Sequence, residues 1–190
     1  MITFEEDLRN SVKALKEGKV ILYPTDTVWG IGCDCTNAAA VARIFSIKGR
    51  SDSKSLIVLV DSEFMLQRYV KEVPDAASQI ISVSDQPLTI IYPSGKNLAA
   101  GVTAEDGSIG IRITADPFCS ELIGRLRRPI VSTSANISGE PAPSNFVDVS
   151  KAIVESVDYT AWHKREDRHR HSASPVIKIE LNGQIKIIRK

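Results

Sequence analysis

The stretch Val20-Ile21-Leu22-Tyr23-Pro24-Thr25-Asp26-Thr27-Val28-Trp29-Gly30-Ile31-Gly32 joins a short apolar run to a polar loop. Residues 20–23 are typical of a buried strand, and Pro24 ends it. Ligands of open α/β sheets bind beyond the carboxyl ends of strands, so the hydroxyl-rich loop is a candidate binding segment. The alternative is a turn in which Thr25 and Asp26 only satisfy backbone groups.

Helices and strands alternate on both sides of this stretch. Thr3 with Glu6 forms a capping box for a helix over residues 3–17, and Asn37 can cap a helix that runs to about Ile47. We expect Asp61 to cap the helix that follows it, and further helices over 76–83 and from Asp116-Pro117. Strands are expected over 56–60, 88–92, 108–113 and from 129, and a hairpin of 176–181 with 184–188 around the two-residue turn Asn182-Gly183. This order predicts an α/β fold with one twisted, mixed parallel and antiparallel sheet flanked by helices.

Length and composition limit the classes of protein. With 190 residues, 43% of them hydrophobic, the chain suits one core, so we expect a single domain over residues 1–190. The net charge of +1 argues against a protein that coats nucleic acid but allows a local basic groove. No run approaches the ~20 apolar residues of a membrane span, and the N-terminal sequence lacks a signal pattern, so we expect no membrane contact and a cytoplasmic protein. Three cysteines (Cys33, Cys35, Cys119) are expected to be buried thiols, with zinc as a remote alternative.

Two further segments place polar groups at the ends of elements. Lys48-Gly49-Arg50 follows a helix, and its two cations either bind a polyphosphate or face solvent at the helix C-terminus. The run Ser132-Thr133-Ser134-Ala135-Asn136 continues a strand. Its hydroxyls and amide suit phosphate oxygens, a hydrated metal or an amino acid, and the alternative is a serine-rich turn.

Residues 163–171 form a basic segment that holds all three histidines and four of the Lys and Arg residues. Charged runs usually face solvent, so we expect a solvated loop. The sharper hypothesis is a mobile lid that screens a triphosphate or touches tRNA. In that case charge reversal at Arg168 and Arg170 should raise the KM for ATP or weaken RNA binding.

Taken together, these segments resemble the YrdC-like family, the threonylcarbamoyl-AMP synthases. The family motifs correspond, in order, to residues 24–32, Lys48-Gly49-Arg50, residues 56–60, Gly110-Ile111-Arg112, Ser134-Ala135-Asn136 with Ser138-Gly139, and residues 174–177. Six motifs in the family's order over nearly the whole chain make the resemblance specific. It implies a YrdC-like fold with a concave ligand groove.

The resemblance implies a nucleotidyltransferase that makes threonylcarbamoyl-AMP and pyrophosphate from L-threonine, bicarbonate or CO2, and ATP. Mg²⁺ would be carried with the phosphates, without a metal site of the protein's own. A tRNA threonylcarbamoyl-transferase complex would then modify the adenosine beside the anticodon, and contact with tRNA or double-stranded RNA is a further expectation. The alternative is an RNA-binding module of the same fold without adenylating activity.

The same resemblance assigns roles to residues. The expected catalytic residues are Lys48, Arg50, Ser134 and Asn136, which also bind nucleotide together with Ser108 and Arg189. Thr25, Arg112, Ser132 and Ser174 are expected to bind L-threonine, with Arg112 on its carboxylate. The chain departs from the family pattern at Asp26 (usually Glu), Trp29 (usually Tyr), Leu59 (His in some members), Ala142 (Ser in some members) and Pro175 (usually Thr).

Overall fold

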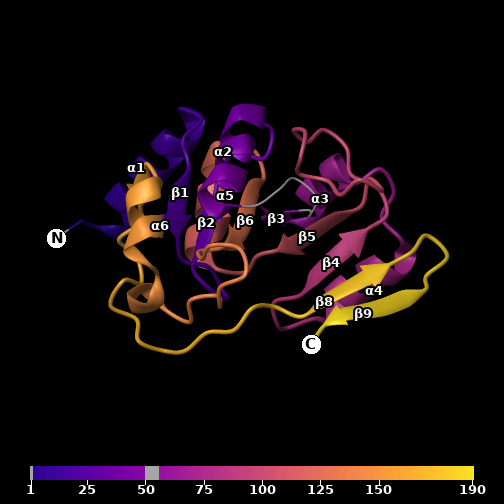
Figure 1. Cartoon of the computed structure of the whole chain (residues 1–190). Helices are drawn as coiled ribbons and strands as arrows, with labels where there is room; N and C mark the ends of the chain where they lie inside the picture. The colour runs from indigo at the N-terminus through magenta and orange to yellow at the C-terminus, as the bar shows by residue number, and fades with distance from the viewer. Residues whose placement is uncertain (1, 50–55) are drawn as a thin grey trace.

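The computed structural model describes residues 2–49 and 56–190, and the strands among them form one nine-stranded sheet (Figure 1). The strands are β1 (Ile21–Tyr23), β2 (Gly30–Gly32), β3 (Ile57–Val60), β4 (Thr89–Tyr92), β5 (Ile109–Ile113), β6 (Ile130–Ser134), β7 (Tyr159–Thr160), β8 (Val176–Ile179) and β9 (Ile185–Arg189). Their order across the sheet is β7-β1-β2-β6-β3-β5-β4-β8-β9. The pairs β1/β7, β3/β5 and β4/β8 are parallel and the others antiparallel, which confirms the expected mixed sheet.

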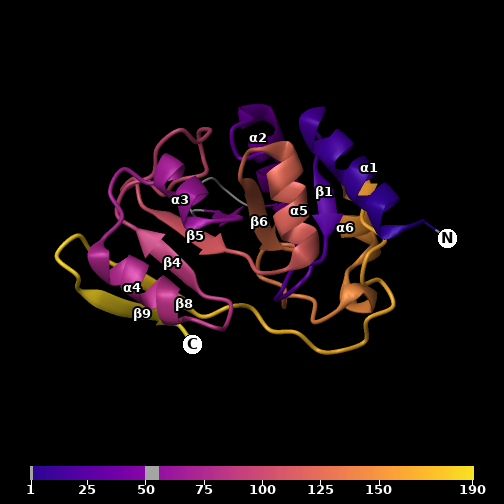
Figure 2. The same cartoon turned by 180° about the vertical axis from the view of Figure 1, so that it is seen from behind.

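Helices cover both faces of this sheet. They are α1 (Phe4–Lys16), α2 (Ala38–Lys48), α3 (Glu63–Tyr69), α4 (Asp75–Val83), α5 (Pro117–Leu126) and α6 (Lys151–Ser156), with a 3₁₀ turn at Phe146–Asp148. In Figure 2 α1, α3, α4 and α5 lie in front of the sheet, whereas α2 and α6 lie on the face turned to the viewer in Figure 1. The predicted α/β class with flanking helices is therefore confirmed.

Side-chain caps explain where three helices begin. Thr3 and Glu6 form the expected capping box of α1. Asn37 accepts a hydrogen bond from the backbone N–H of Ala40, and Asp116 accepts one from that of Cys119. Such caps satisfy backbone donors that lack partners at a helix N-terminus, so these starts can be predicted from the sequence.

Several local expectations were wrong. The cap of α3 is Ser62 rather than Asp61, because the Ser62 hydroxyl accepts the hydrogen bond from the N–H of Met65. The hairpin turn has three residues instead of two, since the N–H of Glu180 donates to the carbonyl of Gln184. The short elements β2, α6 and β7 were not expected, because two to six residues carry too little periodicity to be recognised.

Glycine allows strands β1, β2 and β6 to approach closely. A side chain at Gly32 would place its Cβ 2.4 Å from the carbonyl oxygen of Val131 and 2.6 Å from the Tyr23 ring. Tyr23 is fully buried and its hydroxyl donates to that same carbonyl at 3.3 Å. The end of β1, and with it the loop that follows, is thus held against β6.

The three cysteines are free and buried, as expected. Burial raises the pKa of each thiol, so they behave as apolar side chains of the core. In the described part of the chain, no helix combines the length and apolar character needed to span a membrane.

Candidate active site

Strands β3, β5 and β6 and the segment around Ser174 enclose a cavity of about 200 Å³. Five residues that the sequence assigned to the site line it: Arg112, Ser132, Ser134, Ser174 and Arg189. Four of them lie on β5, β6 and β9, and Ser174 lies two residues before β8. The fold thus brings together segments that are far apart along the chain.

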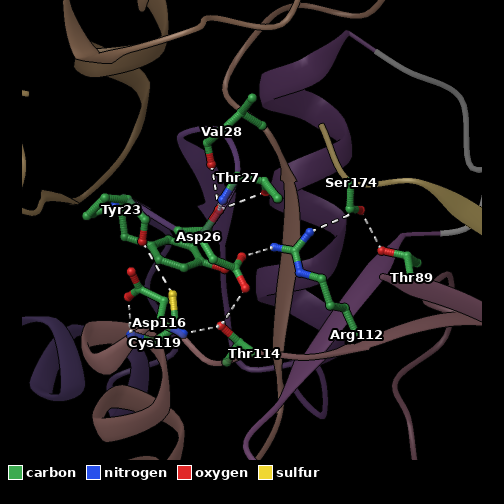
Figure 3. A network of polar contacts seen from close by, with 12 residues as sticks. Tyr23, Asp26, Thr27, Val28, Thr89, Arg112, Thr114, Asp116, Cys119 and Ser174 are labelled. Atoms are coloured by element: carbon green, nitrogen blue, oxygen red, sulfur yellow. Dashed lines mark hydrogen bonds and ion pairs between the residues drawn. The ribbon is translucent and has the colours of Figure 1, made fainter. Parts of the chain in front are cut away.

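Arg112 lies at the centre of a polar network (Figure 3). Its side chain is 4% exposed, and its Nη2 lies 2.9 Å from Oδ1 of Asp26. Its Nη1 donates to the Ser174 hydroxyl at 3.2 Å. The hydroxyl of Thr114 donates to the other oxygen of Asp26 at 3.3 Å. The guanidinium is therefore fixed between a carboxylate and a hydroxyl at the cavity wall.

The loop that supplies Asp26 is shaped by its own hydroxyls. Thr25 donates to the carbonyl of Val28 at 2.8 Å and accepts from the N–H of Thr27 at 3.0 Å. The Cys119 thiol contacts the carbonyl of Pro24 at 3.3 Å. The structure thus places Thr25 inside the loop, whereas its neighbour Thr27 lines the cavity.

Lys48 reaches β6 from the end of α2. It is 3% exposed, and its ammonium donates to the carbonyls of Ser134 at 2.6 Å and of Asn136 at 2.7 Å. The Asn136 amide donates to the carbonyls of Ile137 and Glu140, and its buried Oδ1 has no hydrogen-bond partner within residues 2–49 and 56–190. Lys48 therefore fixes the backbone of β6 at Ser134 and just beyond it. The other expected cation, Arg50, lies outside the described residues.

A second guanidinium shares the cavity with Arg112. Arg189 donates from Nε and Nη2 to the carbonyl of Ser174, at 3.0 and 2.7 Å. Burial, and then the positive charge of Arg112, lower the pKa of Arg189. Arg112 and Arg189 both line the cavity, and their two guanidinium groups favour a ligand that carries negative charge.

Ser108 does not reach this cavity. It precedes β5 and is 7% exposed, and its N–H donates to Oδ1 of Asp106. Conversely, the sequence analysis assigned no ligand role to Thr27, although it belongs to the hydroxyl-rich loop. It also gave no signal for Thr89, which lies in the network of Figure 3 behind Ser174.

The first two residues of the basic segment, His163 and Lys164, pack against helices α1 and α5. The His163 ring lies 5.1 Å from the Phe4 ring and 5.3 Å from the Phe118 ring, measured between centroids. Lys164 Nζ lies 2.5 Å from Asp116 Oδ2 at the start of α5. The expectation of a solvated loop is thus wrong for these two residues.

The rest of the basic segment is tied together by Asp167. Its carboxylate accepts hydrogen bonds from the backbone and ring of His169 and contacts the ring of His171 at 3.1 Å. These hydrogen bonds hold the pKa of Asp167 well below its usual range. His171 and Lys164 lie beside Thr27 around a small hollow, so this segment covers the outside of the Asp26 loop.

The sequence model of the Sua5_yciO_yrdC family, described as "Telomere recombination", matches residues 13–190. The chain belongs to this family. This confirms the resemblance that the ordered motifs indicated. The family model spans every segment that lines the cavity.

Two relatives within the Sua5/YciO/YrdC family carry the name threonylcarbamoyl-AMP synthase. The one from Pseudoalteromonas translucida (strain TAC 125) is 32% identical over 92% of this chain and 94% of its own length. The one from Xanthomonas axonopodis pv. citri (strain 306) is 36% identical over 80% of this chain and 83% of its own. These names support the enzyme interpretation over the RNA-binding module.

A solved structure of the family has the same architecture. P. abyssi Sua5 complexed with L-threonine has a TM-score of 0.81 at 28% sequence identity. The match covers 94% of this chain and 52% of the Sua5 chain, so this chain spans about half of that longer relative. The similarity confirms the expected YrdC-like fold.

Proposed function

We propose that this protein is a threonylcarbamoyl-AMP synthase, which converts L-threonine, bicarbonate or CO2, and ATP into threonylcarbamoyl-AMP and pyrophosphate. The observation that carries the proposal is a single cavity at which two guanidinium groups and three serine hydroxyls converge. This donor set suits two anions at once, a carboxylate and a phosphate. Relatives that bear this name over most of their length support the same activity.

L-Threonine would occupy the side of the cavity formed by Arg112 and Ser174. The guanidinium would pair with the amino acid's carboxylate while Asp26 keeps it in place. Ser132 and Thr27 would contact the amine and the side-chain hydroxyl from the opposite wall, and Thr25 would act by shaping the loop. A site that hydrogen-bonds the substrate hydroxyl rejects valine, because its polar groups would be left unpaired.

ATP would contact groups from two strands, β6 and β9. Ser134 and Arg189 line the cavity, and Lys48 and Asn136 lie at the end of β6. We assign the triphosphate to these groups together with Arg50. Ser108 is the least supported member of the expected nucleotide set, since it does not line the cavity.

The chemistry needs positioning and charge neutralisation more than covalent help. A neutral threonine amine captures CO2 as a carbamate, and a carbamate oxygen attacks the α-phosphorus of ATP. The bond from the α-phosphorus to the bridging oxygen breaks, and pyrophosphate leaves. Arg189 and Lys48 would stabilise the negative charge that develops on the phosphates.

Mg²⁺ fits as an ion that arrives with the triphosphate. Among residues 2–49 and 56–190 no three His, Cys, Asp or Glu side chains gather into a group that could hold a metal ion. The Oδ1 of Asn136, which has no hydrogen-bond partner in the described part of the chain, and the Ser134 hydroxyl are oxygens of the type that accept hydrogen bonds from the waters of Mg²⁺. The ion would supply charge neutralisation on the leaving pyrophosphate.

We further propose that residues 1–190 act as one catalytic domain in the cytoplasm. The product would pass to a tRNA threonylcarbamoyl-transferase complex, which modifies the adenosine beside the anticodon. Contact with tRNA or double-stranded RNA would involve the exposed part of the basic segment, residues 168–170.

Pyrophosphate release tests the proposal. The purified protein is incubated with ATP and Mg²⁺, with and without L-threonine and bicarbonate, beside Lys48→Ala. Release that requires both co-substrates and is lost in the variant supports the activity and the phosphate site together. No release by the wild type under any combination would overturn the proposal.

A further inference from the structure

Thr89 lies directly behind the candidate threonine site without lining it. It is the first residue of β4 and is completely buried. Its hydroxyl oxygen is 2.9 Å from the hydroxyl oxygen of Ser174. Ser174 in turn lines the cavity and accepts a hydrogen bond from Arg112 (Figure 3).

The direction of the hydrogen bond between these two hydroxyls follows from counting donors and acceptors. A hydroxyl has one proton to donate and two lone pairs to accept with, whereas a guanidinium only donates. Arg112 therefore fills one lone pair of Ser174. In the described part of the chain Ser174 is the hydrogen-bond partner of the Thr89 hydroxyl, so a Thr89 that did not donate to Ser174 would leave its proton buried without an acceptor.

Thr89 thus donates to Ser174 and fills its second lone pair. With both lone pairs occupied, the one group that Ser174 still offers is its proton, and it lies at the cavity wall. Ser174 then presents a donor to any ligand there. A carboxylate or hydroxyl oxygen accepts such a hydrogen bond, whereas an ammonium group does not.

We propose that Thr89 is a positioning residue that fixes the Ser174 hydroxyl as a hydrogen-bond donor to the substrate carboxylate. This inference rests on the proposed function and specifies one of its subsites. Arg112 and Ser174 form a pair of donors for one carboxylate, beside each other on the same wall. The amine of the substrate must then lie elsewhere in the cavity, where no donor competes for the lone pair that captures CO2.

The test compares variants that change the hydroxyl and retain the shape of the side chain. Thr89→Val removes the hydroxyl at nearly constant volume, and Thr89→Ser keeps it. Thr36→Val is the matched control, because the Thr36 hydroxyl donates to Asp34 at 2.7 Å, away from the cavity. KM and kcat for L-threonine and KM for ATP are measured by pyrophosphate release, and thermal unfolding checks that each variant is folded.

We expect Thr89→Val to raise the KM for L-threonine about 5- to 10-fold, the effect of one lost hydrogen bond, with the KM for ATP unchanged. Thr89→Ser and Thr36→Val should keep the wild-type KM. In a Ser174→Ala background Thr89→Val should add less than about a twofold change, because the hydroxyl it orients is already gone. Thr89→Ala carries the same expectation if the valine variant does not fold.

Three results would overturn the inference. The KM for L-threonine could stay unchanged in Thr89→Val while the wild type is active. Thr89→Ser could fail to restore it, which would indicate a role in packing. The effect of Thr89→Val could also persist undiminished in the Ser174→Ala background. A wild type that releases no pyrophosphate would instead overturn the proposed function, and this inference with it.

Discussion

The two walls of the cavity are built in different ways. The β6 wall presents Ser132 and Ser134 from a single strand, and the Lys48 ammonium binds the backbone at its end. The Arg112 wall presents Arg112 and Ser174, and an ion pair and a hydrogen bond join Arg112 to Asp26 behind it and to Ser174, from three distant segments. Strand periodicity aligns the two serines, whereas the second set depends on an ion pair that is largely removed from water. A single substitution should therefore damage the Arg112 wall more.

The largest loss of stability is expected from Arg112→Met, which removes the ion pair with Asp26 and the hydrogen bond to Ser174. The substitution leaves the Asp26 carboxylate, only 13% exposed, without its cation. Removing one partner of a buried pair lowers the free energy of unfolding by about 3–5 kcal/mol. Urea denaturation measures the loss.

The matched control for that experiment is Arg125→Met. Arg125 also pairs with a carboxylate, that of Glu5 at 2.5 Å, but both side chains are largely exposed. Exposed pairs contribute little to stability, because water screens their charges. Equal losses in the two variants would mean that the Asp26–Arg112 pair does not behave as a buried one.

A smaller effect is expected on the β6 wall from Lys48→Met. This variant removes the donor to the carbonyls of Ser134 and Asn136. Both carbonyls are partly buried and lose a charged donor, although that of Ser134 still accepts from the N–H of Asn136. We expect the free energy of unfolding to fall by about 1–3 kcal/mol, again measured by urea denaturation. Lys13→Met, on the exposed face of α1, should change it by less than about 0.5 kcal/mol. A loss in Lys48→Met as large as that in Arg112→Met would contradict the difference between the walls.

The smallest effect concerns His163, which anchors the basic segment that covers the Asp26 loop. Burial, followed by the charge of Lys164, lowers the pKa of His163, while the carboxylates of Asp116 and Asp7 raise it in part. A histidine with a lowered pKa in the folded state binds protons more readily when unfolded. The stability it contributes is therefore present above about pH 6.5 and decreases as the pH falls below that value.

His163→Phe keeps an aromatic ring between Phe4 and Phe118 and removes the titration. We expect the melting temperature of the wild type to fall more steeply between pH 7.5 and 5.5 than that of the variant. Parallel pH profiles of the two proteins would show that His163 does not contribute to this decrease.

The same contrast explains which parts of the site could be predicted. Ser132, Ser134 and Lys48 stand out because each lies at the end of a strand or helix with recognisable caps and periodicity. Arg112 was identified only by resemblance to a family motif, and the sequence left its partner Asp26 in a loop that could be either a binding segment or a turn. Contacts between residues 86 positions apart, such as Asp26 and Arg112, depend on tertiary packing that no local pattern encodes. Thr89 was missed for that reason.

Most of the fold could be predicted from the sequence, because helix caps and apolar runs are local patterns. Helices α1, α2 and α5 begin at side-chain caps, and apolar runs mark β1, β3 and β4. The β2 strand was missed because Gly30 and Gly32 have low strand propensity and are present for close approach to Ser132 and Tyr23. The need for glycine at these two strand positions depends on residues of the neighbouring strands, which the local sequence does not show.

The division of the cavity into a threonine wall and a nucleotide wall is tested most directly by two matched alanine substitutions. Ser174→Ala and Ser134→Ala each remove one hydroxyl that lines the cavity, the first just before β8 and the second at the end of β6. Steady-state pyrophosphate release gives the KM of each variant for L-threonine and for ATP. We predict that Ser174→Ala raises the KM for L-threonine alone and that Ser134→Ala raises the KM for ATP alone. If both variants raise the KM for the same substrate, the two walls do not bind different substrates and this account is contradicted.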